Sequence, residues 1–185
     1  MNITKNFLSL GKMARGDTNN TTRPLLFTKP LEKIIIHWIG PYAHAPASVR
    51  NWWENGSDGK GVRASAHFVV KDEFVLQCLP LNEVGWHSGN MRNYSSIGIE
   101  VSPKDATGEF SEKTINTLRE LVGHIKKETN RNLELERHFD GFQKKDCPRF
   151  YTPLTSLFEG GGRVVNPEGG QQRWEILKSF LNNPE

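Results

Sequence analysis

The sequence predicts an α/β fold, a single domain with a central mixed β-sheet flanked by helices. Two observations lead to this prediction. Short apolar runs of the kind that form buried strands alternate along the chain with segments of helical periodicity, which is the pattern of an α/β domain. At 185 residues, the chain is long enough to bury one substantial core and too short for two large ones.

The first predicted elements are a polar arm, a buried strand and a short helix. Residues 1–24 form the arm, because "GKMARGDTNNTTRP" is polar and rich in turn-forming residues. The run "KIIIHWIG" contains three successive β-branched residues and predicts a buried central strand with His37 at its C-terminal end. In "APASVRNWWENG", Pro46 and Ser48 favour a helix start and Gly56 favours a stop.

The middle of the chain predicts a hairpin, a further strand and the longest helix. "SAHFVVKDEFVLQCLP" indicates two strands around a "KDE" turn, and "SSIGIEV" indicates a strand that ends near Glu100. Ser111 can cap the helix "SEKTINTLRELVGHIKKETN", whose apolar residues fall on one stripe. The stripe consists of Ile115, Leu118, Leu121, Val122 and Ile125.

The end of the chain predicts a connection and a last helix. Residues 159–185 comprise the glycine-rich "EGGGRVVNPEGG" and the helical pattern "QRWEILKSFL", which leaves residues 25–158 as the main domain. Whether this helix packs on the domain or contacts another chain stays open. The oligomeric state stays open with it.

Composition and charge limit the partners. The formal net charge is +3, the pI is near 8.9, and the basic residues form neither a block nor a basic amphipathic helix, so we expect no nucleic-acid binding. No segment approaches the roughly 20 apolar residues that span a bilayer, which predicts no membrane insertion. The N-terminal "FLSL" is shorter than the apolar region of about 7 to 15 residues in a signal peptide, which predicts synthesis in the cytoplasm without export by that route.

The two cysteines have different surroundings. Cys78 lies in "FVLQCLP", typical of a buried strand end, whereas Cys147 lies in the polar stretch "ERHFDGFQKKDCPRF". A cysteine kept for packing usually has apolar neighbours. In a reducing compartment, a separate role for each cysteine is a better interpretation than a disulfide.

Three residues are candidate metal ligands. His37 ends the predicted buried strand, while His138 and Cys147 lie in or beside the polar loop. Two imidazoles and one thiolate suit zinc, and a site with three protein ligands leaves the fourth position for water or substrate. No local motif such as H-E-x-x-H supports this set. A hydrogen-bonded, purely polar role for each histidine therefore stays open.

Glu100 and Lys145 are candidates for proton transfer and charge stabilisation. A carboxylate at the end of the apolar strand "SIGIEV" is costly to bury unpaired, so Glu100 is salt-bridged, functional or turned to solvent. Lys145, two residues before Cys147, can place an ammonium where it stabilises an oxyanion. Its alternative is a solvated lysine in the charged loop "QKKD".

The remaining histidines divide into three kinds. His67 alternates with apolar residues in "SAHFVV", which favours a structural, hydrogen-bonded histidine over a ligand. His87 in "GWHSG" lies between glycines beside Trp86, a composition that suits a groove wall binding sugar or peptide. His44 and His124 have no feature that points to chemistry.

Five blocks of the sequence, in order, resemble those of type-2 N-acetylmuramoyl-L-alanine amidases. The blocks are "IIIHWIG", "SAHFVV", "GWHSGN", "NYSSIGIEV" and "HFDGFQKKDCP", and they cover roughly residues 31–153. This family includes phage endolysins and is related to the peptidoglycan recognition proteins. The resemblance implies their α/β fold and makes residues 25–158 a zinc amidase catalytic domain.

The resemblance also implies a set of site residues. His37, His138 and Cys147 fall on the family's zinc ligands. Glu100 falls on the catalytic glutamate of "SIGIE", and Lys145 falls on the lysine two residues before the third ligand. With zinc and these residues, the implied reaction is hydrolysis of the amide between N-acetylmuramic acid and L-alanine of bacterial peptidoglycan.

The resemblance also indicates which residues line the substrate groove, and it shows one difference from the family. The resemblance places Trp86 and His87 along the groove, with Asn93 nearby. Some relatives have a catalytic tyrosine where this chain has Ala66, which assigns proton transfer to Glu100 here. The resemblance has no match after residue 158, and whether the natural chain continues into a wall-binding domain stays open.

Several functions are compatible with this pattern. The first is a phage or prophage endolysin, made in the host cytoplasm and acting at the cell wall after release. The alternatives are a cytoplasmic amidase that recycles muropeptides, a non-catalytic peptidoglycan-binding module, and a cysteine peptidase that uses Cys147 with His138. Target species and stem-peptide type are not encoded in any recognisable motif.

Overall fold

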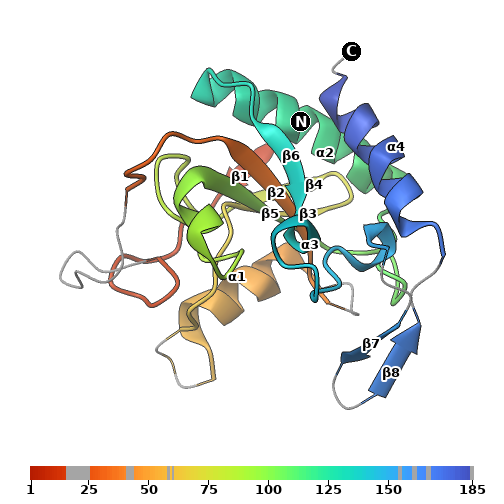
Figure 1. Ribbon diagram of the computed structural model, residues 1–185. Helices are drawn as coiled ribbons and strands as arrows, with labels where there is room; N and C mark the ends of the chain where they lie inside the picture. Colours follow the sequence, from red (N-terminus) through yellow and green to blue (C-terminus); the bar gives the residue numbers. More distant parts are fainter. Residues whose placement is uncertain are drawn as a thin grey trace.

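The computed structural model describes residues 1–15, 26–40, 44–57, 59, 61–153, 156–159, 162–165 and 168–183. Its centre is a six-stranded sheet in the order β1-β4-β3-β5-β2-β6 (Figure 1). β3 and β4 pair antiparallel, and the other neighbours pair parallel, which confirms the predicted mixed sheet. The strands are β1 Ile3–Lys5, β2 Lys33–Trp38, β3 Phe68–Lys71, β4 Phe74–Gln77, β5 Ser96–Val101 and β6 Glu134–Arg137.

Helices cover both faces of this sheet. α2 and α4 lie side by side on one face, and α1 lies on the other (Figure 1). Two short 3₁₀ helices, η1 and η2, and a two-stranded β7–β8 hairpin complete the described part of the chain. The bounds are α1 Pro46–Asn55, η1 Met91–Ser95, α2 Glu112–Thr129, α3 His138–Gly141, η2 Arg149–Tyr151, β7 Ser156–Glu159, β8 Gly162–Val165 and α4 Gly170–Asn182.

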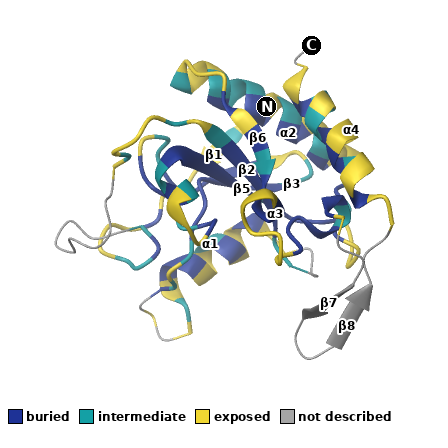
Figure 2. Ribbon diagram, viewed as in Figure 1, coloured by how far each residue is buried: buried dark blue, intermediate teal, exposed yellow. Residues whose placement is uncertain are grey.

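Strand register divides the apolar side chains between two cores. Residues that pair across neighbouring strands point to the same face, and successive residues alternate between faces. Ile36 pairs with Ile99, and this face packs under α2 and α4. Val69, which pairs with Glu100, lies on the opposite face and packs with Trp53 of α1. The strands between the two helical layers are accordingly buried (Figure 2).

The helix ends follow the predicted chemistry. α1 begins at Pro46 and ends before Gly56, whose positive φ of 58° suits glycine. Ser111 caps α2 by accepting a hydrogen bond from the backbone N–H of Thr114. The predicted stripe of α2 faces the core.

The two cysteines are separate, as predicted. Cys78 is buried in the core under α1, and Cys147 is buried at the other end of the sheet. Both thiols are free.

Both ends of the described chain are more integrated than the sequence predicted. Within the predicted arm of residues 1–24, Ile3–Lys5 extends the sheet as its edge strand beside β4, and Leu8 is buried under α1. Residues 16–24 of that arm lie outside the described residues. At the boundary between the predicted domain and the predicted connection, β7 (Ser156–Glu159) pairs antiparallel with β8 (Gly162–Val165). α4 then packs on α2 and buries Trp174 and Leu177 in the main core, so it belongs to the domain.

None of the helices in the described ranges combines the length and the hydrophobicity that crossing a membrane requires.

Candidate functional site

The candidate site begins where two neighbouring strands end. His37 of β2 and Glu100 of β5 are partners in the parallel register, so both side chains leave the same face of the sheet near its C-terminal edge. His37 Nδ1 lies 3.9 Å from Glu100 Oε1. The side chain of His37 is 2% exposed and that of Glu100 is 19% exposed, so the carboxylate reaches the surface of the site.

His138 and Cys147 complete a cluster around His37. β6 runs beside β2, and His138 is the first residue of α3, directly after β6. His138 Nδ1 lies 3.0 Å from His37 Nδ1, and Cys147 Sγ lies 3.7 Å from the same nitrogen. Three potential ligand atoms thus lie within 4.8 Å of one another, and all three residues are buried. The structure brings the predicted ligand set together.

The donor set fits a zinc ion. Tetrahedral zinc with bonds of about 2.0 to 2.3 Å separates its ligand atoms by roughly 3.3 to 3.7 Å. The distances of 3.0 Å and 3.7 Å from His37 Nδ1 to the other two ligand atoms are near this range. Burial lowers the pKa of His37 and His138, which keeps both imidazoles neutral, the form that binds metal. Burial raises the pKa of the Cys147 thiol, and binding of a divalent cation opposes this by stabilising the thiolate. Three protein ligands leave one position for water or substrate.

His87 holds His37 in the form that a metal requires. Ser96 Oγ donates its proton to the Arg92 carbonyl at 2.6 Å, so toward His87 Nε2, at 3.5 Å, it can only accept. His87 therefore carries its proton on Nε2, and its Nδ1 accepts from His37 Nε2 at 3.0 Å. This series of hydrogen bonds leaves the lone pair of His37 Nδ1 directed at His138 and Cys147.

The rest of the "GWHSGN" block supports the same arrangement. Asn93 Oδ1 accepts hydrogen bonds from the backbone N–H groups of His87 and Ser88 and from the Ser88 hydroxyl. The backbone of Ser88 in turn hydrogen-bonds the His138 ring. At Gly98 of β5, a Cβ would lie 2.5 Å from the His87 ring, so glycine makes room for the imidazole. His87 and Asn93 are thus buried behind the three candidate metal ligands.

This placement differs from the groove wall that the sequence indicated. His87 and Asn93 are 8% and 3% exposed, and their side chains are engaged inside the protein. Trp86 is half-buried and makes an edge contact with Tyr94. A histidine between two glycines gives no signal of which way its ring turns, and only the empty space over Gly98 explains the inward direction.

Arg92 is a site residue that the sequence did not reveal. Its guanidinium donates to the carbonyl of His138 at 2.9 Å and is ion-paired with Glu136 at 2.8 Å. A Cβ at Gly141 would lie 2.0 Å from that guanidinium, so α3 packs directly on it. Arg92 therefore fixes the start of α3, which carries His138.

Two further buried ion-paired residues hold the loop of Cys147. Asp146 accepts a hydrogen bond from Arg149 Nε at 3.0 Å and one from the hydroxyl of Thr152. The guanidinium of Arg149 lies 4.6 Å from the ring centroid of Trp38. Cys147 is therefore buried within a polar stretch of sequence, because Asp146 and Arg149 pair with each other while Lys144 and Lys145 are exposed.

The surroundings of Glu100 favour the protonated form of its carboxyl group. Burial raises the pKa of Glu100 to about 8, and the charge of Lys145 opposes the rise. Lys145 itself is exposed, and its backbone N–H donates to the Phe142 carbonyl at 2.9 Å. The lysine charge also lowers the pKa of His37 and His138, which places it on the cluster side of the site.

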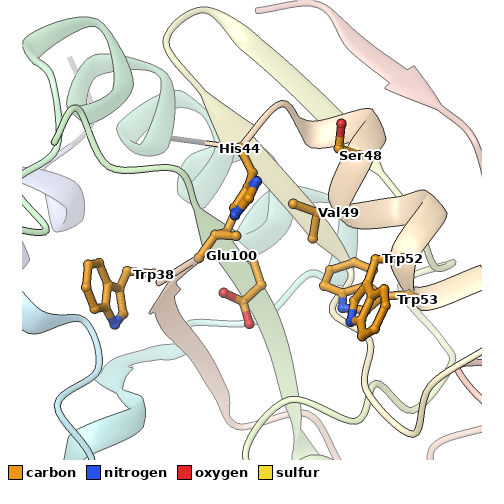
Figure 3. Close-up of a pocket in the computed structure, with 8 residues that line it drawn as sticks. Trp38, His44, Ser48, Val49, Trp52, Trp53 and Glu100 are labelled. Carbon is orange, nitrogen blue, oxygen red and sulfur yellow. The ribbon is translucent and has the colours of Figure 1, made fainter. Parts of the chain in front are cut away.

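A pocket of about 460 Å³ opens beside Glu100, between α1 and the ends of β2 and β5 (Figure 3). The indoles of Trp38 and Trp52 lie on opposite sides of the Glu100 carboxylate (Figure 3). The lining consists of Trp38, Ile39, His44, Ser48, Val49, Trp52, Trp53 and Glu100. Sequence reasoning missed this pocket, although "NWWEN" held a signal: neighbouring helical residues point about 100° apart, so one of two adjacent tryptophans must leave the core.

The fold and cluster define a class, an α/β domain with a candidate His-His-Cys metal centre and a carboxylate at the C-terminal edge of a mixed sheet. A family model described as N-acetylmuramoyl-L-alanine amidase, Amidase_2, matches residues 27–150. The chain therefore belongs to the N-acetylmuramoyl-L-alanine amidase family.

Relatives of this family are similar along different parts of the chain. The amidase XlyA of Bacillus subtilis (strain 168) is 30% identical over 188 residues, which cover 97% of this chain and 59% of XlyA. The amidase CwlH of the same organism is 37% identical over 89 residues, 46% of this chain and 35% of CwlH. This chain thus spans less than two thirds of either relative.

Solved structures show the same fold. The catalytic domain of XlyA superposes with a TM-score of 0.67 at 24% identity, covering 98% of this chain and 99% of that domain. The structure of PlyL superposes with a TM-score of 0.70 at 17% identity over the whole of both chains.

Proposed function

We propose that this chain is a zinc-dependent N-acetylmuramoyl-L-alanine amidase that hydrolyses the amide between N-acetylmuramic acid and L-alanine in bacterial peptidoglycan. The observation that carries the proposal is the His37, His138 and Cys147 cluster with Glu100 3.9 Å from His37. A related solved structure is that of a mutant endolysin from Bacillus subtilis, and by this analogy we assign the reaction to cell-wall lysis.

His37, His138 and Cys147 hold the zinc ion in this proposal, and the ion supplies Lewis acidity and a water of lowered pKa. Glu100 accepts the proton of the attacking water, whose oxygen bonds to the lactyl carbonyl carbon. As the C–N bond breaks, Glu100 delivers that proton to the departing nitrogen of L-alanine. Its pKa, raised to about 8 by burial, suits a group that must take up and release a proton near neutrality.

Lys145 stabilises the negative charge that develops on the carbonyl oxygen. Its location supports this role, because its charge acts on both Glu100 and the histidine cluster. A cysteine peptidase using Cys147 is disfavoured by the same surroundings: burial and the Glu100 carboxylate raise the pKa of the thiol, whereas a nucleophilic cysteine needs a lowered one.

The decisive experiment measures lysis and bond specificity together. Purified peptidoglycan is incubated with the protein, with protein stripped by a strong chelator, and with stripped protein given back zinc. We expect turbidity to fall only with zinc-loaded protein and new N-terminal alanine to appear in proportion. A thiol alkylator added to zinc-loaded protein should have little effect, because the metal shields the thiolate.

Two results would contradict the proposal. Zinc-loaded protein that sediments with walls but releases no alanine would indicate a non-catalytic binding module. Activity that survives the chelator but not the alkylator would indicate a cysteine peptidase. The choice between wall lysis and recycling of soluble fragments follows from comparing rates on intact peptidoglycan and on soluble muropeptides.

A further inference from the structure

One peptide group connects two of the three candidate metal ligands. It is the peptide between His138 and Phe139, at the start of α3. Its N–H, on Phe139, donates to the Cys147 carbonyl at 2.9 Å. Its C=O, on His138, accepts from Arg92 Nη2 at 2.9 Å. Because the N–H and C=O of a planar trans peptide point in opposite directions, the Arg92 guanidinium and the Cys147 backbone hold this group from opposite sides.

The guanidinium of Arg92 is itself fixed to the sheet. Its Nη1 donates to Glu136 Oε2 at 2.8 Å, and Oε1 of the same carboxylate is paired with Lys33. Glu136 belongs to β6 and Lys33 to the neighbouring β2, so two strands anchor the carboxylate. A planar guanidinium binds a carboxylate and a carbonyl at once through separate nitrogens. Arg92 thereby ties the start of α3 to the sheet.

The backbone of Arg92 is held as well. Its N–H donates to Asn90 Oδ1 at 2.9 Å, and its C=O accepts from Ser96 Oγ at 2.6 Å. The same serine hydroxyl faces His87 Nε2, behind His37. An arginine whose backbone and side chain are both engaged is a rigid support, which metal ligands require from the groups behind them.

We propose that Arg92 is a positioning residue for the metal centre: by holding the peptide group between His138 and Phe139, it sets the separation of the His138 and Cys147 ligand atoms. This inference rests on the zinc site of the proposed function. When the carbonyl of His138 loses this donor, the start of α3 shifts relative to Cys147, and zinc affinity falls.

Charge and position predict opposite effects for the removal of Arg92. A cation near a bound dication repels it, so a purely electrostatic role means that a neutral side chain at this position tightens zinc binding. A positioning role means that the same substitution weakens zinc binding. The sign of the change in zinc affinity therefore separates the two roles.

The test measures zinc affinity by competition with a chelator of known affinity, for the wild type, Arg92→Met and Arg92→Lys. Methionine keeps an unbranched apolar stem, whereas lysine also keeps the charge but not the planar fork. Arg15→Met is the matched control. Arg15 is ion-paired with Glu83 at 2.8 Å and donates to the Leu8 carbonyl at 2.6 Å, and its side chain is 14% exposed against 15% for Arg92. It has the same kinds of partner as Arg92, and neither partner is a candidate metal ligand.

We expect Arg92→Met to weaken zinc binding roughly 10- to 100-fold, and Arg92→Lys to recover part of this loss. Arg15→Met should lower the melting temperature of the zinc-free protein about as much as Arg92→Met does, but leave zinc affinity unchanged. Cobalt(II) in place of zinc gives a spectroscopic readout, because its visible absorption depends on ligand geometry. The cobalt bands should shift in Arg92→Met and match those of the wild type in Arg15→Met.

A second variant moves the guanidinium without changing its charge. A Cβ at Gly141 would lie 2.0 Å from Arg92 Cζ, so Gly141→Ala must displace the guanidinium, and zinc affinity should fall with the charge still present. Its control is Gly123→Ala in α2, where a Cβ meets no atom within 4 Å. This pair keeps the proposal testable if Arg92→Met fails to fold.

Three results overturn the inference alone: unchanged or tighter zinc binding in Arg92→Met, an equal loss of zinc affinity in Arg15→Met, or wild-type zinc affinity in Gly141→Ala. A wild type that binds no zinc overturns the proposed function together with this inference, because both depend on the same three ligands.

Discussion

Two buried histidines, His37 and His67, differ in what surrounds their ring nitrogens. Both lie on the same face of the sheet, and burial lowers the pKa of both. His67 Nε2 donates to the Glu83 carbonyl at 2.8 Å, and its Nδ1 accepts from the Gly98 N–H at 3.0 Å. Backbone groups thus satisfy the whole ring, as the sequence predicted for a structural histidine.

His37 has only one satisfied nitrogen. Its Nε2 is paired with His87, while its Nδ1 faces a second imidazole and a thiol. Such convergence of lone pairs is unfavourable without a cation, whereas two backbone partners make a histidine self-sufficient. The comparison teaches that burial does not mark a ligand histidine. A ligand histidine is marked by a ring nitrogen that has no hydrogen-bond partner of its own and faces other potential metal-ligand atoms.

The largest expected effect comes from replacing each of the two histidines in turn and comparing the variants. His37→Ala should abolish stoichiometric zinc binding and reduce peptidoglycan hydrolysis by far more than the roughly 10- to 100-fold typical of a residue behind the ligands. His67→Gln should keep one zinc per chain and lose stability instead. Elemental analysis and thermal unfolding measure the two outcomes, and zinc loss in His67→Gln would contradict the distinction.

The next effect separates binding from turnover. Glu100→Gln removes the proton acceptor but keeps the shape of the side chain, so hydrolysis should fall roughly 10²- to 10⁴-fold while zinc content stays unchanged. Alanine release and elemental analysis are measured on the same sample. Full activity in this variant would show that another group moves the proton.

Acid stability should report on His67. Burial lowers its pKa from 6.5 to about 4, so the unfolded chain binds a proton that the folded chain refuses. The contribution of neutral His67 to the free energy of unfolding is fully present above pH 6.5. It should be lost as the pH drops from 6.5 to 4, which lowers the free energy of unfolding by up to about 3 kcal/mol. Chemical unfolding of wild type and His67→Gln at several pH values measures it. The variant should lose less stability over this range, because the other buried histidines are common to both chains. Parallel curves would contradict this role.

The smallest effect concerns the hydrogen-bond chain behind His37. His87→Phe keeps a ring over Gly98 but removes the acceptor for His37 Nε2, so zinc affinity should fall roughly 10- to 100-fold. His87→Gln, which retains an acceptor, should recover part of it. Competition with a chelator of known affinity measures both variants. Unchanged affinity in His87→Phe would show that His37 needs no such support.

Local patterns predicted much of this fold. Three successive isoleucines predicted β2 with His37 at its end, and a capped apolar stripe predicted α2. The pairing of His37 with Glu100 could not come from local pattern, because β2 and β5 are far apart in sequence and only their register sets it. The family resemblance supplied that link.

The misplaced expectations concern side-chain direction and chain ends. "GWHSGN" suggested a groove wall, but Gly98, on a different strand, gives the His87 ring space to turn inward. Ile3–Lys5 has too little hydrophobicity to predict a strand, and it forms one because β4 offers a free edge. Long-range packing decided both, and neither signal lies within the segment itself.

The three clustered side chains also have a mechanical consequence. His37 is separated along the chain by 101 residues from His138 and by 110 residues from Cys147. An ion held by all three would act as a reversible cross-link between the end of β2, the start of α3 and the loop before η2, closing a large part of the domain into one loop. The concentration of free zinc would then determine the free energy of unfolding as well as the rate of catalysis, so the melting temperature should rise with free zinc concentration.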